Sequence, residues 1–450
     1  MIFGTDGVRD IPGTGLLTPD SIDRIGQAIV AHLTSEVAPG GSVLIARDTR
    51  VTGAEIESLL AGAIRRAGCT TIHAGVLPTP AVSLLLMDGV ADLGLVISAS
   101  HNPPEFNGIK IIDASGAKLA QDQEHSISET YAISEGKPES QQEIEVIEEL
   151  GVQYLDKLLS SFPEGEFLAG LKVVLDCARG AACHWGPEAF RRAGADVTVV
   201  HGEPDGARIN VGCGSLHPEF LGEEVKRTNS VLGIAFDGDA DRALFSDEFG
   251  RYVDGDDVIV IWARALLEQG LLDPAIVALT VMSNAGVEDC LRRQGIEVVR
   301  TEVGDRAVAD ALRRSGGTLG GEPSGHIIHH SEAATGDGIR TGLAIARCIV
   351  EAGEPLSRLC DGITRFPQEQ KTLRIQHRPP LDELQYLAEA MIEARAELGS
   401  GGRILVRYSG TEPLLRILVE AKKEVDASFW IDRIEQSAMR EASLGITASF

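Results

Sequence analysis

Residues 42–76, SVLIARDTRVTGAEIESLLAGAIRRAGCTTIHAGV, contain the pattern that decides the fold. An apolar run of strand length (42–47) precedes an amphipathic helical pattern (53–67), and a second strand pattern (70–76) follows the helix-ending glycine Gly68. This order predicts a β-α-β unit. Strands that alternate with helices are typical of the α/β class of folds.

The same order occurs twice more along the chain. Strand patterns at 171–176 and 197–200 flank a helical pattern that ends at Gly194, and those at 275–281 and 296–300 flank one that ends at Gly295. Each helical pattern ends in Arg-Arg-x-Gly, but any helix C-terminus favours this tetrad, so it is weak evidence for triplication. The recurring units predict three similar α/β domains.

Polar and proline-containing stretches indicate where these domains end. An acidic, glutamine-rich stretch covers 134–149, a strand and a turn precede Gly250, and RFPQEQ surrounds Pro367. The residues after Pro367 alternate short strands with helices, which predicts a smaller α+β domain. We therefore expect four domains, at residues 1–150, 151–250, 251–366 and 367–450.

Composition excludes several classes of function. The 450 residues carry a formal net charge of −26, which repels nucleic acids and anionic lipid surfaces. No uncharged apolar run approaches the roughly 18 residues that a membrane span needs, and the first residues, MIFGTDGVRD, do not form an export signal. The seven cysteines are scattered without a C-x-x-C pair, which favours reduced thiols. We expect a soluble, cytoplasmic protein that binds neither nucleic acid nor membranes.

The first candidate site is ISASHNPPEFNGIK at residues 97–110, directly after a strand pattern. Ser100 would then lie at the carboxyl edge of a sheet, where open α/β folds bind ligands, and is a candidate nucleophile. His101 and Lys110 are candidates for moving protons or offsetting phosphate charge. The alternative is an ordinary Asn-Pro turn in which Ser100 only caps the local backbone.

The second candidate site is GIAFDGDADRALFSDE at residues 233–248. Three carboxylates on one tight loop predict a Mg²⁺ site. An EF-hand is the rival, because Glu248 stands at the twelfth position, but Arg242 replaces the glycine that its sixth position needs, and a strand precedes the loop. A purely structural acidic turn is the other alternative, and Arg242 is also a candidate for holding a phosphate oxygen. The proposed metal-binding carboxylates are Asp237, Asp239 and Asp241.

The third candidate site is GGEPSGHIIHH at residues 320–330. Glu322 and Ser324 offer an acceptor and a hydroxyl on a proline-stiffened loop, which suits paired sugar hydroxyls. His326 is a candidate for a phosphate contact or for proton transfer. The two histidines that end the motif have no metal-site spacing, and a structural role is favoured for them.

The fourth candidate site is RYSGTEPLLR at residues 407–416. A strand ends in one arginine, a Ser-Gly-Thr turn offers hydroxyls and backbone N–H groups, and a second arginine follows. This arrangement predicts a phosphate cradle, with an ordinary turn between strands as the alternative. Its members are Arg407, Ser409, Gly410, Thr411 and Arg416.

These four loops, in this order, resemble those of the α-D-phosphohexomutase superfamily. FGTDGVR at residues 3–9 and VGDRAV at 303–308 are similar to the bacterial phosphoglucosamine mutases within it. The resemblance covers essentially the whole chain. It implies three similar α/β domains with mixed sheets and a smaller C-terminal α+β domain around a central cleft, each contributing one loop.

The resemblance also implies a role for each loop. Ser100 would be phosphorylated in the resting enzyme and would hold Mg²⁺ together with the three aspartates. Arg9 and Arg242 would flank that phosphate, and Lys110 and His101 would be the candidates for proton transfer. Glu322, Ser324 and His326 would bind the sugar, and the fourth loop would bind the phosphate that is not reacting.

The implied reaction interconverts glucosamine 6-phosphate and glucosamine 1-phosphate through a 1,6-bisphosphate, with a sugar 1,6-bisphosphate as activator. Pro323 departs from the Glu-Gln-Ser usual in the phosphoglucosamine enzymes, so a phosphomannomutase or phosphoglucomutase is the nearest alternative. A metal-dependent sugar phosphatase and a non-catalytic sugar-phosphate or Ca²⁺ binder are the others. The partner expected is a small phosphosugar, and a homodimer is among the expected assemblies.

Overall fold

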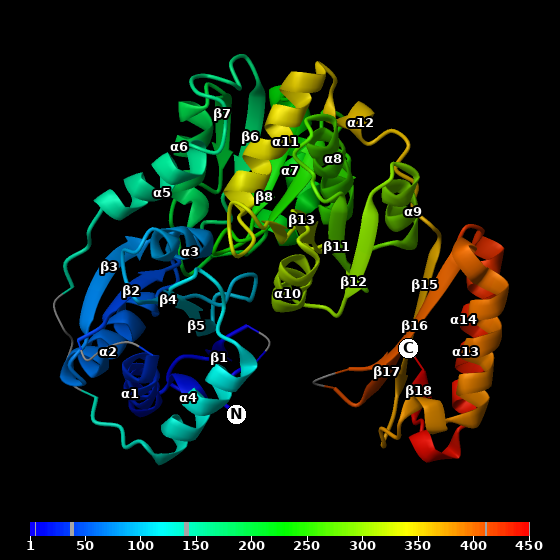
Figure 1. Ribbon diagram of the computed structural model, residues 1–450, viewed down its shortest axis with the longest axis horizontal. Helices are drawn as coiled ribbons and strands as arrows, with labels where there is room; N and C mark the ends of the chain where they lie inside the picture. Colours follow the sequence, from blue (N-terminus) through cyan, green and yellow to red (C-terminus); the bar gives the residue numbers. More distant parts are fainter. Residues whose placement is uncertain (5, 37–39, 139–143, 410–411, 450) are drawn as a thin grey trace. The chain divides into compact units, whose positions relative to one another are not determined.

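The computed structural model describes residues 1–4, 6–36, 40–138, 144–409 and 412–449 (Figure 1). The chain forms two compact units. One comprises Met1–Thr280 and Val299–Asp361, and the other comprises Val281–Val298 and Gly362–Phe450. None of the described helices is long and apolar enough to cross a membrane.

The first sheet has the strand order β1-β5-β4-β2-β3. Strand β2 pairs parallel with β3 and β4, whereas β5 is antiparallel to β4 and β1 is antiparallel to β5. The bounds are β1 (Val8–Asp10), β2 (Ser42–Arg47), β3 (Thr70–Val76), β4 (Leu93–Ile97) and β5 (Asn107–Asp113), with helices α1 (Pro19–Glu36), α2 (Gly53–Arg66), α3 (Thr79–Met87) and α4 (Gln121–Ile133).

Helices cover both faces of this sheet because its strands are apolar on both sides. Val43, Ile45 and Leu95 point to one face, where they share a core with residues of α1 and α2. The opposite face carries Gly94, where an added Cβ would lie 2.6 Å from side chains of α3. The close approach of α3 to the sheet therefore requires a glycine at this position.

The second sheet has the order β10-β9-β8-β6-β7. Strands β7 and β8 are parallel to β6, and β9 is antiparallel to β8. The bounds are β6 (Lys172–Asp176), β7 (Asp196–Val200), β8 (Leu232–Phe236), β9 (Ala243–Asp247) and β10 (Tyr252–Val253), with helices α5 (Glu149–Leu159), α6 (Ala182–Arg192) and α7 (Pro218–Thr228).

The third sheet has the order β12-β11-β13-β14, with β11 parallel to β13 and β14 antiparallel to β13. The bounds are β11 (Ile276–Thr280), β12 (Glu297–Thr301), β13 (Leu319–Gly321) and β14 (Ile327–His329). The helices of this part of the chain are α8 (Gly255–Glu268), α9 (Ala285–Arg293), α10 (Asp305–Ser315), α11 (Gly338–Ala352) and α12 (Leu356–Leu359).

The three sheets share one topology, which confirms the prediction of three similar α/β domains. In each, the four main strands lie in the order fourth, third, first, second, and the fourth is antiparallel to the third. The loop between the third and fourth strands contains Ser100 in the first sheet, Asp237 in the second and Glu322 in the third. The candidate residues thus occupy equivalent positions in three related domains.

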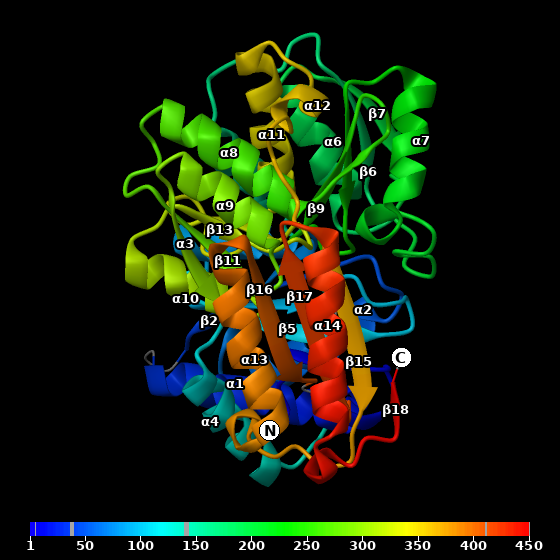
Figure 2. The ribbon, with the colours of Figure 1, turned by 90° about the vertical axis from the view of Figure 1, so that its right-hand side faces the viewer.

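The fourth sheet lies in the second unit and has the order β16-β17-β15-β18, with antiparallel neighbours throughout. Figure 2 shows α13 and α14 lying side by side along the sheet. Leu387 of α13, Ile417 of β17 and Trp430 of α14 belong to one core between the helices and the sheet. The predicted α+β domain is therefore confirmed. The bounds are β15 (Gln368–Arg374), β16 (Gly402–Tyr408), β17 (Leu414–Ala421), β18 (Ala448–Ser449), α13 (Gln385–Leu398) and α14 (Glu424–Met439).

Candidate active site

Ser100 lies in the loop that leaves the carboxyl end of β4, and its side chain is buried. Its hydroxyl donates a hydrogen bond to Asp237 Oδ2 at 2.6 Å and lies 3.3 Å from Nδ1 of His101. The Ser100 backbone has φ 51°, in the left-handed region that residues other than glycine rarely adopt. Surrounding contacts hold the serine in this unfavourable conformation, which is a common property of functional residues.

The loop of residues 237–242, which we call the aspartate loop, follows β8, and the carboxylates of Asp237, Asp239 and Asp241 are all buried. One oxygen of each lies within 4.8 Å of an oxygen of the other two, and Oδ1 of Asp239 and Oδ1 of Asp241 are buried without a hydrogen-bond partner. Carboxylate oxygens gathered in this way are the ligands that hard divalent cations such as Mg²⁺ prefer. The donor set therefore fits the predicted metal.

The charge of the aspartate loop is only partly balanced by the protein. Burial and the nearby carboxylates of Asp241 and Asp239 raise the pKa of Asp237 well above its usual value. A cation bound between the three side chains would offset this repulsion. The electrostatics and the unpartnered oxygens thus favour the same interpretation.

Lys110 comes from β5, and its Nζ lies 2.7 Å from Asp239 Oδ2, 3.2 Å from Asp241 Oδ2 and 3.0 Å from Asp6 Oδ2. Burial opposes its charge, but Asp239 and Asp241 outweigh that effect and raise its pKa well above the usual value. Lys110 is therefore held as an ammonium. Lys110 contacts two of the three carboxylates, and the third, that of Asp237, accepts the hydrogen bond from Ser100 instead.

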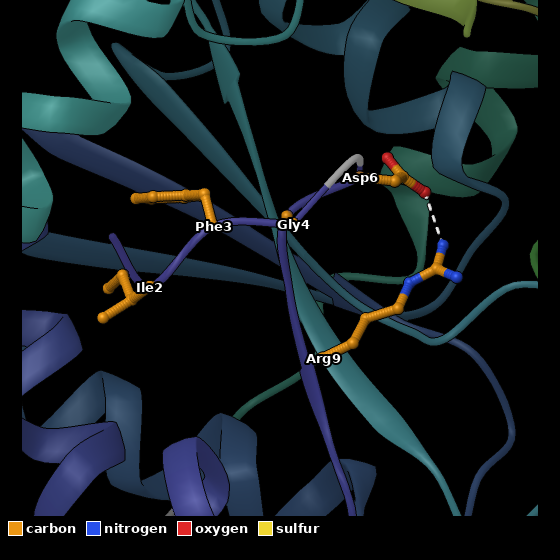
Figure 3. Close-up of a pocket in the computed structure, with 6 residues that line it drawn as sticks. Ile2, Phe3, Gly4, Asp6 and Arg9 are labelled. Atoms are coloured by element: carbon orange, nitrogen blue, oxygen red, sulfur yellow. Dashed lines mark hydrogen bonds and ion pairs between the residues drawn. The ribbon is translucent and has the colours of Figure 1, made fainter. Parts of the chain in front are cut away.

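Arg9 lies on β1, and its side chain faces Asp6, which precedes the strand. Figure 3 shows its guanidinium directed at Asp6, with an Nη2–Oδ2 distance of 2.7 Å, and its Nη1 donates to Asn102 Oδ1 at 3.2 Å. A pocket of about 370 Å³ opens here; its lining comprises Ile2, Phe3, Gly4, Asp6, Gly7 and Arg9. One donor of Arg9, its Nε, is buried and unpartnered.

Arg242 ends the aspartate loop, and its backbone N–H donates to Asp237 Oδ1 at 3.2 Å. Its Nε is also buried without a partner, 3.7 Å from Asp241 Oδ1. Burial, followed by the positive charges of Arg242 and Arg9, lowers the pKa of His101 to about 4. The His101 ring contacts the Ser100 hydroxyl, and two guanidinium groups with unused donors act on that ring, which suits an anion bound beside the serine.

The loop between β13 and β14, which we call the sugar loop for its expected role, reaches the aspartate loop through His326. His326 Nδ1 lies 3.7 Å from Asp241 Oδ1, and its Nε2 accepts the backbone N–H of Gly336 at 3.0 Å. Glu322 Oε1 accepts the N–H of Gly304 at 3.0 Å, and Ser324 Oγ lies 3.5 Å from Glu322 Oε2. Three of the four predicted loops therefore meet within the first unit.

The fourth candidate site, residues 407–416, which we call the phosphate loop for its expected role, belongs to the second unit. Arg407 on β16 and Arg416 on β17 are direct cross-strand partners, so their side chains project from the same face of the sheet. Ser409 is buried; its N–H donates to the carbonyl of Leu414 at 2.9 Å. Gly410 and Thr411 lie outside the described residues. The pair of arginines is the arrangement expected of an anion cradle.

Several residues of the site were not predicted from the sequence. Asp6 joins Lys110, Thr79 donates from its hydroxyl to Asp239, and Lys118 pairs with Asp6 and Asp305. Asp6 and Asp305 lie within the two motifs FGTDGVR and VGDRAV. These motifs indicated the family that the chain resembles, but they did not indicate that the two aspartates contact the site. Thr79 and Lys118 lie in segments without a distinctive pattern.

A second group, comprising Asp176, His201 and Cys213, also brings three potential metal ligands within 4.8 Å of one another. Both oxygens of Asp176 already accept backbone N–H groups, at 3.0 and 2.9 Å. Arg179 Nη1 donates to Cys213 Sγ at 3.2 Å and places a positive charge beside the thiol. These contacts favour a structural role for this group.

Models of four domain families match the chain in order. They describe the phosphoglucomutase/phosphomannomutase alpha/beta/alpha domain I (residues 1–137), domain II (152–250), domain III (254–366) and the C-terminal domain (366–436). A phosphoglucomutase/phosphomannomutase family protein from Burkholderia thailandensis has the same fold, with a TM-score of 0.81, 23% identity and coverage of 99% of this chain and 98% of that one. N-acetylphosphoglucosamine mutase of Aspergillus fumigatus is more distant, with a TM-score of 0.59, 16% identity and coverage of 94% and 99%.

The fold and the site thus define a phosphosugar mutase, an isomerase. Phosphoglucosamine mutase of Gluconacetobacter diazotrophicus is 41% identical over 425 residues, 94% of each chain. That of Pelotomaculum thermopropionicum is 43% identical over 431 residues, covering 94% of this chain and 95% of its own. The chain belongs to the phosphoglucosamine mutase family.

Proposed function

We propose that this mutase interconverts glucosamine 6-phosphate and glucosamine 1-phosphate by way of a phosphoserine at Ser100. The observation that carries the proposal is the 2.6 Å hydrogen bond from the Ser100 hydroxyl to Asp237, a member of the buried carboxylate triad. The names of the relatives support glucosamine as the sugar. Phosphoryl transfer needs chiefly positioning and countercharge, and this part of the site offers both.

The Ser100 loop would carry the phosphoryl group, and Asp237, Asp239 and Asp241 would hold Mg²⁺ with it. When bound, the ion supplies positive charge to the transferring phosphoryl group. The unused Nε donors of Arg9 and Arg242 support hydrogen bonds to its remaining oxygens.

Lys110 and His101 are the proposed groups for proton transfer to and from the reacting sugar hydroxyl. Both lie beside the serine, since Lys110 contacts two of the metal-binding carboxylates and the His101 ring is 3.3 Å from the Ser100 hydroxyl. The hydroxyl that attacks the phosphoserine must lose its proton, and the serine oxygen that leaves must gain one. Lys110 and His101 would accept the first of these protons and supply the second.

The sugar and its distal phosphate would be held by the other two loops. Glu322 and Ser324 present a carboxylate and a hydroxyl to a pair of sugar hydroxyls, with His326 next to them. The distal phosphate would bind the paired guanidinium groups of the fourth loop and its turn. The residues proposed for this cradle are Arg407, Ser409, Gly410, Thr411 and Arg416.

The reaction balances in two transfers. The O1 hydroxyl of glucosamine 6-phosphate takes the phosphoryl group from Ser100, which gives the 1,6-bisphosphate and a free serine. After the intermediate turns over, the serine hydroxyl takes the 6-phosphoryl group and leaves glucosamine 1-phosphate. A sugar 1,6-bisphosphate from outside would restore the phosphoserine when it is lost, which is the proposed role of the activator.

We further propose that the enzyme works in the cytoplasm and as a homodimer, with domains bounded at residues 150, 250 and 366. All seven cysteines are free thiols, which supports a reducing compartment. Sedimentation of the purified protein measures the oligomeric state directly.

Intact-mass analysis tests the proposed function. The purified protein should carry one phosphoryl group, and Ser100→Ala should carry none and should lose mutase activity. Ser115→Ala, which removes an exposed serine hydroxyl, is the matched control and should keep both. Turnover of glucosamine, glucose and mannose phosphates establishes the sugar. Release of inorganic phosphate without any sugar 1-phosphate would instead identify a phosphatase.

A further inference from the structure

Arg50 is a fully buried arginine next to the Ser100 loop, and the steps described above leave it without a role. It follows β2 in the sequence Asp-Thr-Arg, and its side chain is 0% exposed. Its Nε donates to Asp48 Oδ2 at 3.0 Å. Its other four N–H groups all donate to backbone carbonyls of the Ser100 loop, namely those of Pro103 (2.6 Å), Phe106 (2.8 Å), Ser100 (2.9 Å) and Asn102 (2.7 Å).

Asn210 makes the same contacts from the second α/β domain. Its Nδ2 donates to the carbonyl of Ser100 at 2.9 Å and to that of Asn102 at 3.2 Å. Asn210 is buried and has φ 61°, a left-handed conformation that asparagine tolerates better than most residues. Two side chains from different domains therefore hold the same pair of carbonyl groups.

The N–H of Ser100 is fixed by the same cluster. It donates to Ser98 Oγ at 2.9 Å, and that hydroxyl donates to Asp48 Oδ2 at 2.6 Å, the oxygen that Arg50 also binds. Both polar backbone groups of Ser100 are thus held while its φ is 51°. The conformation that directs its hydroxyl at Asp237 is unfavourable by itself, so these contacts maintain it.

Arg50 differs from the arginines that we assign to the phosphate. Arg9 and Arg242 are partly exposed, and each has a buried Nε without a partner. Arg50 has no N–H left to offer to a phosphate or a sugar, since an arginine carries five and all five are used. Any effect of Arg50 on the reaction must act through the Ser100 loop, whose carbonyls it holds.

We propose that Arg50 and Asn210 are positioning residues, which hold the Ser100 carbonyl from two domains so that the Ser100 hydroxyl stays directed at Asp237. This inference rests on the proposed role of Ser100 as phosphoryl carrier. It accounts for the arginine at position 50. Only the planar, forked guanidinium can donate to four carbonyls at once, whereas an ammonium has three donors at one point.

The test compares Arg50→Lys and Asn210→Gly with the wild type. Arg50→Lys keeps the charge beside Asp48 and removes the fork, and we expect kcat to fall by about 100-fold, as misplacement of a reacting group by about 1 Å does. KM should stay within about threefold, because the sugar and phosphate loops are unchanged. Hydrogen exchange of residues 98–106 should be faster.

Asn210→Gly keeps the test decisive if Arg50→Lys does not fold. Glycine adopts φ 61° without strain, so this variant removes the amide donor and leaves the backbone as it is. Since Arg50 still holds the same carbonyls, we expect a smaller fall in kcat, about tenfold, again with KM within about threefold.

Arg403→Lys is the matched control. Arg403 also places Nε on a carboxylate, that of Glu420 at 2.5 Å, and its Nη groups on the carbonyls of Val281 and Ser283 at 2.9 and 2.7 Å. It makes these contacts within the second unit, so its variant should lower the melting temperature and keep kcat within about threefold of wild type.

Three results would overturn the proposal. The positioning roles are wrong if Arg50→Lys or Asn210→Gly folds and keeps wild-type kcat, or if Arg403→Lys loses as much kcat as Arg50→Lys. They are also wrong if KM rises while kcat is unchanged. Full activity of Ser100→Ala would instead overturn the proposed function, and an inactive Ser100→Ala alongside normal positioning variants would overturn only the positioning roles.

Discussion

The hydroxyl of Ser100 lies 2.6 Å from Oδ2 of Asp237, although 137 residues separate them in the chain. They belong to loops at equivalent positions of two sheets with the same topology. A phosphate on Ser100 would add negative charge to a group of buried carboxylates. Such an arrangement is stable only when a cation balances it, so the site predicts a dependence on divalent metal.

Asp237→Asn tests this dependence. Burial, Asp241 and Asp239 all raise the pKa of Asp237, so its charge is unfavourable without metal, and a neutral amide of the same shape should relieve the repulsion. In EDTA we expect the variant to be more stable than the wild type by about 1 kcal/mol, which corresponds to about 1 °C in melting temperature for a chain of this length. Added Mg²⁺ should stabilise the wild type only, by about 2.7 kcal/mol at 100 times Kd, and its melting temperature should rise accordingly. An equal response of both proteins to Mg²⁺ would exclude Asp237 as a ligand.

Lys110→Met should destabilise the protein as well as inactivate it. The change leaves the buried carboxylates of Asp6, Asp239 and Asp241 without their common ammonium, and breaking a buried ion pair costs about 3–5 kcal/mol. Urea unfolding without metal measures the loss. Lys157→Met is the control, because its ion pair with Asp88 is exposed and should contribute less than about 1 kcal/mol. Similar losses in the two variants would contradict the described role of Lys110.

Much of the fold could be predicted because apolar runs and glycines mark its elements. The expected strands at 42–47 and 70–76 coincide with β2 (Ser42–Arg47) and β3 (Thr70–Val76), and the expected helix at 53–67 is one residue longer than α2 (Gly53–Arg66). A further Arg-Arg-x-Gly, at 313–316, lies outside the three repeated units, and it ends α10 with Gly316 in the left-handed conformation. A general rule for helix ends therefore explains this tetrad better than duplication does.

The site was predictable where function requires a particular side chain next to a strand end. Ser100, Asp237 and Glu322 met that condition, and the structure brings their loops together. Arg50 and Asn210 did not, because they act on backbone carbonyls of a loop distant in sequence, and a carbonyl acceptor leaves no sequence pattern. Asp6 and Lys118 form contacts between loops that only the folded chain brings together.

Acid sensitivity should depend in part on His329. Burial, followed by Arg340, lowers its pKa to about 4 from 6.5, so between these values the unfolded chain binds a proton that the folded chain does not. This contribution to stability is present above pH 6.5 and is lost as the pH falls towards 4, by at most about 3 kcal/mol. His329→Phe keeps the stacking on Trp262 and removes the titration. The melting temperature should fall less between pH 7 and pH 4.5 in the variant than in the wild type. Equal falls in the two proteins would contradict the prediction.

Pro323→Gln tests whether the unusual sugar loop sets the choice of hexose. The Pro323 carbonyl accepts the N–H of Gly255 at 3.1 Å, and Glu322 is held by Gly304, so backbone contacts keep the loop in place without the proline ring. We expect kcat/KM for glucosamine 6-phosphate to change by less than about tenfold and its preference over glucose 6-phosphate to persist. A reversal of preference would make Pro323 a specificity residue.

Gly238→Ala should separate the geometry of the site from its chemistry. Gly238 lies in the aspartate loop, and an added Cβ would lie 2.6 Å from the carbonyl oxygen of Ser100, a backbone atom that cannot yield without moving the serine. No catalytic group is lost, yet displacement of the hydroxyl by about 1 Å should lower kcat by about 100-fold. Gly401→Ala is the control, because its nearest neighbour is a flexible lysine side chain at 3.8 Å. If Gly238→Ala kept wild-type kcat, the two loops would be able to move apart without loss of function, and the close contact of Ser100 with Asp237 would not be required for phosphoryl transfer.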